Sequence, residues 1–142
     1  MNKCAEKETI NVFFEDRSYK IRRKEVIDTI EKVLRKEKRY GEAVNIIFLG
    51  DKRITELNRM YFGKNSTTDV ISFNFDDNDL LGEIYISLPQ ARRQAKEYSV
   101  FIKQEVKRLL IHGLLHLLGY DHTDKDNRSK MIALQENYLK QV

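Results

Sequence analysis

The chain has 142 residues, 41% of them hydrophobic and 34% charged, and 26 Lys and Arg against 22 Asp and Glu give a net charge of +4. This length is typical of one domain with one core, so we treat residues 1–142 as a single domain. The longest apolar stretch, 109–118, is far shorter than the roughly 20 residues that cross a bilayer, and the first residues lack an apolar leader. Cys4 is the only cysteine, which excludes an internal disulfide and a Cys-x-x-Cys site. We expect a soluble protein of a reducing compartment.

The first half of the chain alternates strand and helix patterns. Residues 10–14 alternate as in a strand, and apolar residues then recur at helical spacing over 21–39. The apolar run 44–49 is typical of a buried strand. Asp51 is placed to cap the next helix, and the segment 63–67 follows it as a loop.

The second half begins with two strand patterns, at 70–75 and 81–87, which are close enough to form a hairpin. Ser87 is placed to begin a helix, and a long helix follows over 101–118. Asp124 is placed to cap a last helix that runs to the end of the chain. About four strands and five helices in mixed order predict an α+β fold, with helices packed on a mixed sheet.

Charge is unevenly distributed along the chain. Between residues 17 and 39 there are ten Lys and Arg against four Asp and Glu, whereas 69–87 holds five acidic residues and no basic one. The basic segment is a candidate for phosphate contacts. A solvated face of an amphipathic helix is the commoner explanation of such a charge run.

All three histidines lie within eleven residues, 112–122. His112 and His116 are four apart on the long helix, which places both rings on one face, about 6 Å apart along the axis. Gly119 then ends the helix and allows the chain to bring His122 back as a third ligand. Three imidazoles with an open fourth position are typical of a catalytic zinc site. Because the helix around them is apolar on nearly all sides, unpartnered imidazoles in it would be costly.

The spacing of the histidines follows the metzincin pattern H-E-x-x-H-x-x-G-x-x-H, except that Gly113 replaces the glutamate base. A glycine inside a helix lowers the stability of the helix by about 1 kcal/mol relative to alanine, so we expect Gly113 to have a specific role. Gly113 either leaves the space beside the metal free of a side chain or allows another helix to pack closely. Without the base, peptidase activity becomes less favoured.

The segment 112–122 resembles the H-G-x-L-H-L-x-G-Y-D-H signature of the YbeY-type endoribonucleases. The segments 57–73, 81–84 and 94–95 fit the same family, so the resemblance extends over essentially the whole chain. It implies one zinc ion held by His112, His116 and His122 in a cytoplasmic protein. It also implies cleavage of single-stranded RNA, maturation of the 3′ end of small-subunit ribosomal RNA, and ribosome quality control. The expected partners are therefore ribosomal RNA and the small subunit or its associated proteins.

One position departs from the family. An arginine is common directly before the Gly-Lys of the loop, and Phe62 stands there in this chain. Lys64 is therefore our first candidate for a catalytic phosphate contact, and Arg59, three residues before Phe62, is the second; an ordinary surface cation is the alternative for each. On resemblance, Asp69 and Ser72 line the pocket.

Two further roles are left open by the sequence. Asp121 either orients an imidazole from behind or simply caps a turn. Tyr61, Phe62 and Tyr120 are candidates for stacking on unpaired bases, although aromatic residues at such spacing are more often core.

Two other functions compete with RNA cleavage. One is a zinc-dependent hydrolase of another substrate class, such as peptides or small esters. The other is a ribosome-associated protein in which zinc only stabilises the fold.

Overall fold

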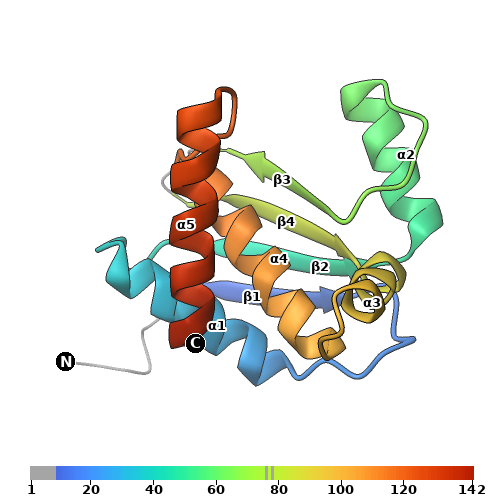
Figure 1. The fold of residues 1–142 in the computed structure, drawn as a ribbon, viewed down its shortest axis with the longest axis horizontal. Helices are drawn as coiled ribbons and strands as arrows, with labels where there is room; N and C mark the ends of the chain where they lie inside the picture. The colour runs from blue at the N-terminus through green and yellow to red at the C-terminus, as the bar shows by residue number, and fades with distance from the viewer. Residues whose placement is uncertain (1–8, 76, 78) are drawn as a thin grey trace.

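The computed structural model describes residues 9–75, 77 and 79–142, so Cys4 and the N-terminal residues considered above lie outside the described part. Figure 1 shows the arrangement of the elements. In chain order these are β1 (Ile10–Phe14), α1 (Arg23–Lys36), β2 (Val44–Leu49), α2 (Asp51–Phe62), β3 (Val70–Asn74), β4 (Gly82–Ser87), α3 (Leu88–Glu97), α4 (Ile102–Leu117) and α5 (Lys125–Gln141). The predicted α+β class, with four strands and five helices, is confirmed.

The four strands form one mixed sheet in the order β1-β2-β4-β3. β1 and β4 both run parallel to β2, which lies between them. β3 runs antiparallel to β4, so the predicted hairpin is confirmed. β3 is therefore an edge strand, and its outer side is available to a neighbouring site.

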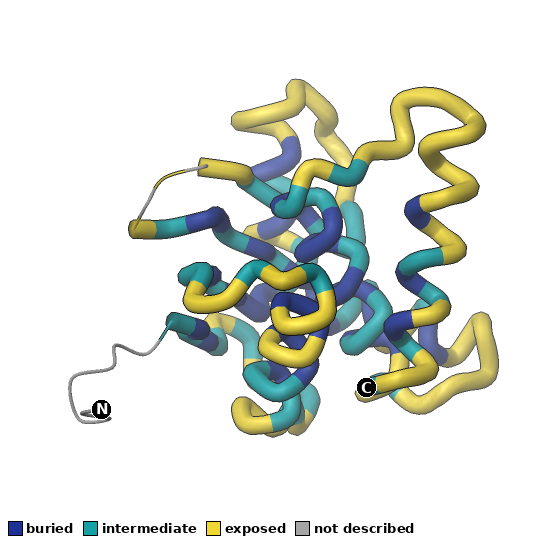
Figure 2. Tube along the Cα trace, turned by 90° about the vertical axis from the view of Figure 1, so that its left-hand side faces the viewer, coloured by how far each residue is buried: buried dark blue, intermediate teal, exposed yellow. Residues whose placement is uncertain are grey.

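Helices cover both faces of the sheet. α1 and α4 pack on one face, where Ile46 and Ile84 belong to the larger buried cluster, and α5 packs on α4. α2 packs on the opposite face, where its residues Ile54 and Leu57 form the smaller buried cluster together with Ile47, Leu49 and Ile71 of the strands. Only one side of α5 is buried, as the alternating colours along that helix show in Figure 2. In Figure 1, β3 lies between α5 and α2, and the upper ends of these two helices extend beyond the sheet.

Helix ends differ from the sequence prediction at two places. The predicted helix over 21–39 is shorter at both ends, because Arg22 has an extended backbone and Lys38 takes a positive φ of 58°. The N-cap of α2 is Gly50 rather than Asp51. The predicted caps Ser87 and Asp124 are confirmed, since their side chains accept hydrogen bonds from the backbone N–H of Gln90 and Asn127.

Asp51 does not cap α2 as predicted, and its side chain instead joins three other parts of the structure. Its carboxylate accepts hydrogen bonds from Arg93, Ser87 and Thr67, at 2.8, 3.0 and 3.2 Å. The pKa of Asp51 is lowered below its ordinary value, mainly by the hydrogen bond from Arg93. The side chain thus ties the loop before β3 to the start of α2 and to α3.

α4 approaches the sheet most closely at Gly113. A Cβ there would lie 2.8 Å from Cγ2 of Ile84 and 3.0 Å from Oγ of Ser72. Ser72 also donates a hydrogen bond to the Gly113 carbonyl (3.0 Å), and Asn74 donates to the Leu117 carbonyl (2.9 Å). The glycine therefore serves close packing, but against β3 and β4 rather than against another helix. This contact fixes the height and rotation of α4 over the edge strand.

We expect Gly113→Ala to lower the free energy of unfolding by about 1–3 kcal/mol, because the added methyl group would push α4 away from fully buried Ile84. Alanine has the better helix propensity by about 1 kcal/mol, so the sign of the change tests the packing explanation. Urea denaturation of the metal-free protein measures it. Ser129→Ala, on the exposed side of α5, is the control for propensity alone. A more stable Gly113→Ala protein would contradict the explanation.

Candidate metal centre

The two helical histidines lie on a side of α4 that the core covers only in part. Nine residues of α4 are buried, whereas His112 and His116 are half-buried and point out of the core. Burial lowers the pKa of His112, and burial followed by the proximity of the other two histidines lowers the pKa of His116 to about 4. Both imidazoles are consequently neutral at pH 7, which is the form that binds a metal.

The turn after α4 brings the third imidazole to the same place. α4 ends at Leu117, and Gly119 follows with a φ of 99°, a backbone conformation that favours glycine. The backbone N–H of Tyr120 donates to the Leu115 carbonyl at 3.0 Å, and its hydroxyl donates at 2.8 Å to Glu37, the C-cap residue of α1. These bonds hold the segment that carries His122. Tyr120 is thus part of the scaffold, and the stacking role proposed for it is not supported.

The three imidazoles converge. The Nε2 atoms of His112 and His116 are 3.2 Å apart, and the ligand atoms of all three histidines lie within 4.8 Å of one another. A tetrahedral ion with bonds of about 2.0–2.1 Å requires about 3.3–3.4 Å between its nitrogen ligands. Among the residues that the structure describes, this group consists of the three histidines, which supply three of the four ligands that a tetrahedral ion takes. His122 is exposed, so the remaining position faces solvent.

A glutamine fixes the direction in which His112 presents its lone pair. The Gln135 Oε1 atom lies 2.6 Å from Nδ1 of His112, and the Gln135 amide nitrogen donates to Glu136 at 3.1 Å. Because an amide oxygen can only accept, Nδ1 carries the proton and Nε2 keeps its lone pair for a metal. The donor set and its tautomer therefore fit a cation.

Gln135, rather than Asp121, supports an imidazole from behind. Asp121 accepts hydrogen bonds from the backbone and hydroxyl of Thr123, at 3.3 and 3.0 Å, so it caps the turn. Gln135 is not among the residues predicted from the sequence. The available signal was its position four residues after Met131, on the buried side of α5, where a polar residue needs a partner.

The position of the missing glutamate also has a structural explanation. Gly113 faces the sheet, and a side chain there would meet Ile84 and Ser72 within about 3 Å. A glutamate side chain has no room at this position. The spacing of the histidines therefore matches the metzincin pattern, but the site lacks the glutamate that acts as the base in metzincins.

A cavity of about 530 Å³ opens from the histidines across the edge of β3. It is lined by Asn58, Phe62, Lys64, Thr68, Asp69, Val70, Ile71, Ser72, Asn74, His112, His116, Leu117 and His122. The expectation that Asp69 and Ser72 line the pocket is confirmed, and Asp69 is the one carboxylate in this lining. Lys64 is also part of it, whereas Arg59 is exposed on α2 outside it.

The loop that carries Lys64 is held by a buried polar side chain. Gly63, with a φ of 67°, ends α2, and the backbone N–H of Lys64 donates to the Asn58 carbonyl at 3.3 Å. The side chain of Asn58 donates to the Ser66 carbonyl at 2.9 Å. Lys64 therefore belongs to an ordered turn, which lies at the cavity wall opposite the histidines.

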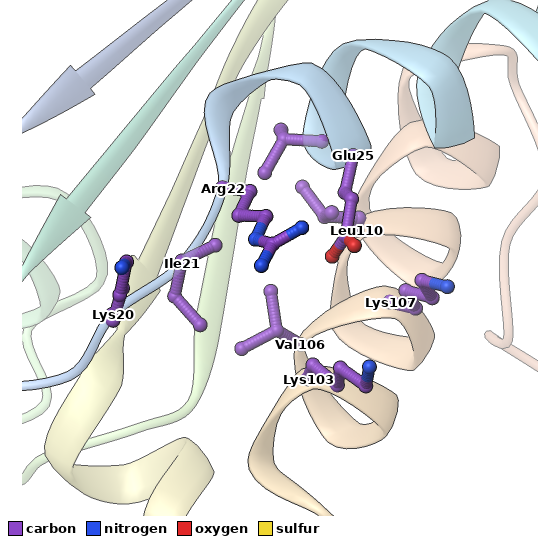
Figure 3. A pocket seen from close by; sticks show the side chains of 9 residues that line it. Lys20, Ile21, Arg22, Glu25, Lys103, Val106, Lys107 and Leu110 are labelled. Atoms are coloured by element: carbon purple, nitrogen blue, oxygen red, sulfur yellow. The ribbon is translucent and has the colours of Figure 1, made fainter.

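A second, smaller hollow of about 270 Å³ lies between α4 and the segment that leads into α1 (Figure 3). Its lining contains four cations and one carboxylate, which are Lys20, Arg22, Lys103, Lys107 and Glu25. Part of the basic segment noted in the sequence lies here, and no histidine does. The hollow is separate from the candidate metal centre.

Comparison with known proteins shows which family the chain is similar to. A family model described as "Endoribonuclease YbeY" matches residues 5–142. A protein of Persephonella marina with that name is 38% identical over 140 residues, which cover 94% of this chain and 90% of the relative. A second one, of Thermodesulfovibrio yellowstonii, is 36% identical and covers 92% of this chain and 95% of the relative.

A solved structure has the same fold. The solution structure of TM1509 from Thermotoga maritima superposes with a TM-score of 0.64 and 29% identity, over 92% of this chain and 87% of that one. The fold and site define a small α+β protein with an open three-histidine centre. The chain belongs to the YbeY endoribonuclease family. Among the described helices, none combines the length and apolar character that a membrane span requires.

We expect Gln135→Leu to weaken zinc binding about 10- to 100-fold, because the Nδ1 proton of His112 loses its acceptor. Gln135→Glu keeps an acceptor at the same place and should stay within several-fold of the wild type. Competition with a chromophoric chelator measures both affinities. Equal zinc affinity of the leucine variant and the wild type would show that Gln135 only fills space.

Proposed function

We propose that this protein is a zinc-dependent endoribonuclease that cuts single-stranded RNA at the three-histidine centre. The observation that carries the proposal is the convergence of three imidazoles at one end of a cavity that also contains Lys64. Family membership supports RNA as the substrate.

Zinc is the ion that the donor set favours, since three imidazoles with one open position are typical of catalytic zinc. His112, His116 and His122 would hold it, and Gln135 would keep His112 in the required tautomer. A zinc ion bound there supplies a Lewis acid for a phosphate oxygen and lowers the pKa of a bound water.

Lys64 is the side chain that we assign to the phosphate. Its ammonium group, on the turn held by Asn58, offsets negative charge that develops on the phosphorus oxygens during cleavage. Arg59 is retained as a second cation at the rim, with a smaller contribution because it lies outside the cavity lining. Asp69 is the one carboxylate in the cavity lining, and we assign to it the task of accepting a proton or a hydrogen bond from a substrate hydroxyl.

The RNA that we propose is the 3′ end of small-subunit ribosomal RNA, with a role in ribosome quality control in the cytoplasm. The family relationship supports this assignment. The partners would accordingly be the small subunit or proteins bound to it. A peptidase is not favoured, because the position of the glutamate base is Gly113 and faces the sheet.

Purified protein should contain close to one zinc per chain and cleave a fluorescent single-stranded RNA. His116→Ala should lose both the metal and the cleavage. Lys64→Ala should keep the metal and lose at least about tenfold in kcat/KM. Arg59→Ala should lose less than Lys64→Ala. Lys107→Ala, in the hollow of Figure 3, is the control for a general loss of positive charge.

Three outcomes of this experiment would contradict the proposal. RNA cleavage that survives in metal-free His116→Ala would place the activity elsewhere. Turnover of casein without cleavage of RNA would favour a hydrolase of another class. RNA binding without cleavage, together with a lower melting temperature after chelation, would favour a structural zinc protein.

A further inference from the structure

The C-terminal end of α2 carries two aromatic side chains that the fold does not bury. Tyr61 is 60% exposed and Phe62 is 51% exposed. The contact of α2 with the sheet is already made by Ile54 and Leu57, which are buried. Two neighbouring aromatic residues in solvent therefore need an explanation other than the core.

The rings of Tyr61 and Phe62 are both held in place by contact with the ring of Phe73. Phe62 lies nearly parallel to Phe73 of β3, at 10° with the centroids 6.0 Å apart, and Tyr61 meets Phe73 edge-on at 4.9 Å. Tyr85 of β4 supports Phe73 edge-on at 5.7 Å. One face of the Phe62 ring thus lies over Phe73, and since half of the residue is exposed, the other face is open to a ligand.

This aromatic ledge is formed by Phe62, Tyr61 and Phe73, and it reaches the metal cavity through Phe62. Phe62 lines the same cavity as Lys64 and the three histidines. Lys64 follows Phe62 by two residues, at the ordered turn after α2. A flat apolar surface, a cation and a metal site are the three contacts that one nucleotide needs for its base, its phosphate and the reacting bond.

We propose that the aromatic ledge is a subsite for one unpaired nucleobase beside the bond to be cut. The base stacks on the open face of Phe62 while its phosphate lies toward Lys64. The subsite rests on the proposed function, because its ligand is part of the RNA substrate.

The subsite gives a physical reason for preferring single strands. A base in a duplex already stacks on its neighbours and must be unstacked before it can cover Phe62, whereas an unpaired base is free to do so. Stacking on an aromatic side chain tolerates all four bases, so the ledge selects for strandedness and not for sequence.

The test compares Phe62→Leu and Phe62→Tyr in the zinc-loaded protein. Phe101→Leu is the matched control, since Phe101 is 79% exposed at the start of α4 and does not line the cavity. Each protein is mixed with one single-stranded RNA and its duplex. Cleavage gives kcat and KM, and 2-aminopurine in the strand reports base stacking by fluorescence quenching.

Phe62→Leu should raise KM for the single strand roughly 5- to 100-fold and lose the quenching, with zinc content unchanged. Phe62→Tyr retains an aromatic ring and should therefore retain the quenching, whereas Phe101→Leu should behave as the wild type. If the wild type cleaves the strand and Phe62→Leu keeps its KM and quenching, the subsite is wrong and the proposed function stands. If the wild type neither binds nor cleaves RNA, both are overturned.

Discussion

The convergence of three imidazoles on the partly covered side of a buried helix is the interaction on which the rest of this structure depends. It requires α4 to lie at one height and one rotation over the sheet edge. Gly113 permits that approach, and hydrogen bonds from Ser72 and Asn74 hold it. The same contact leaves no room for a glutamate at position 113, so the packing that builds the site also removes the base of the related protease motif.

The cavity joins two parts of the chain that are distant in sequence. The histidines come from α4 and the turn after it, whereas Phe62 and Lys64 come from the end of α2, and the edge strand β3 lies between them. Among the described strands, β3 pairs with β4 alone, so its outer edge is free to form the floor of the cavity. One side of the cavity thus offers metal ligands, and the other offers a cation and an aromatic surface.

Local patterns in the sequence predicted much of this fold. The strands and the hairpin were predicted from alternation, from the apolar run 44–49 and from turn residues, and the caps Ser87 and Asp124 were predicted from their side chains. The convergence of the histidines could be predicted because four residues make one helical turn and Gly119 reverses the chain. These features depend on neighbours along the sequence.

The remaining features depend on partners that are distant along the chain. Gln135 supports His112 across 23 residues, and Ser72 bonds Gly113 across 41. Asp51 is a residue type that commonly caps a helix, yet its carboxylate accepts hydrogen bonds from Arg93 and Ser87, which are 42 and 36 residues away along the chain. Phe62 was noted as a departure from the family, but its open ring face became visible only with Phe73 beside it.

X-ray absorption spectroscopy at the zinc edge of the purified protein tests the central claim most directly. The account predicts three imidazole nitrogens at about 2.0–2.1 Å and one oxygen that an added anion displaces. A sulfur ligand at about 2.3 Å, such as Cys4 would supply, or a fourth protein ligand that no anion displaces, would mean a closed structural site and would contradict it.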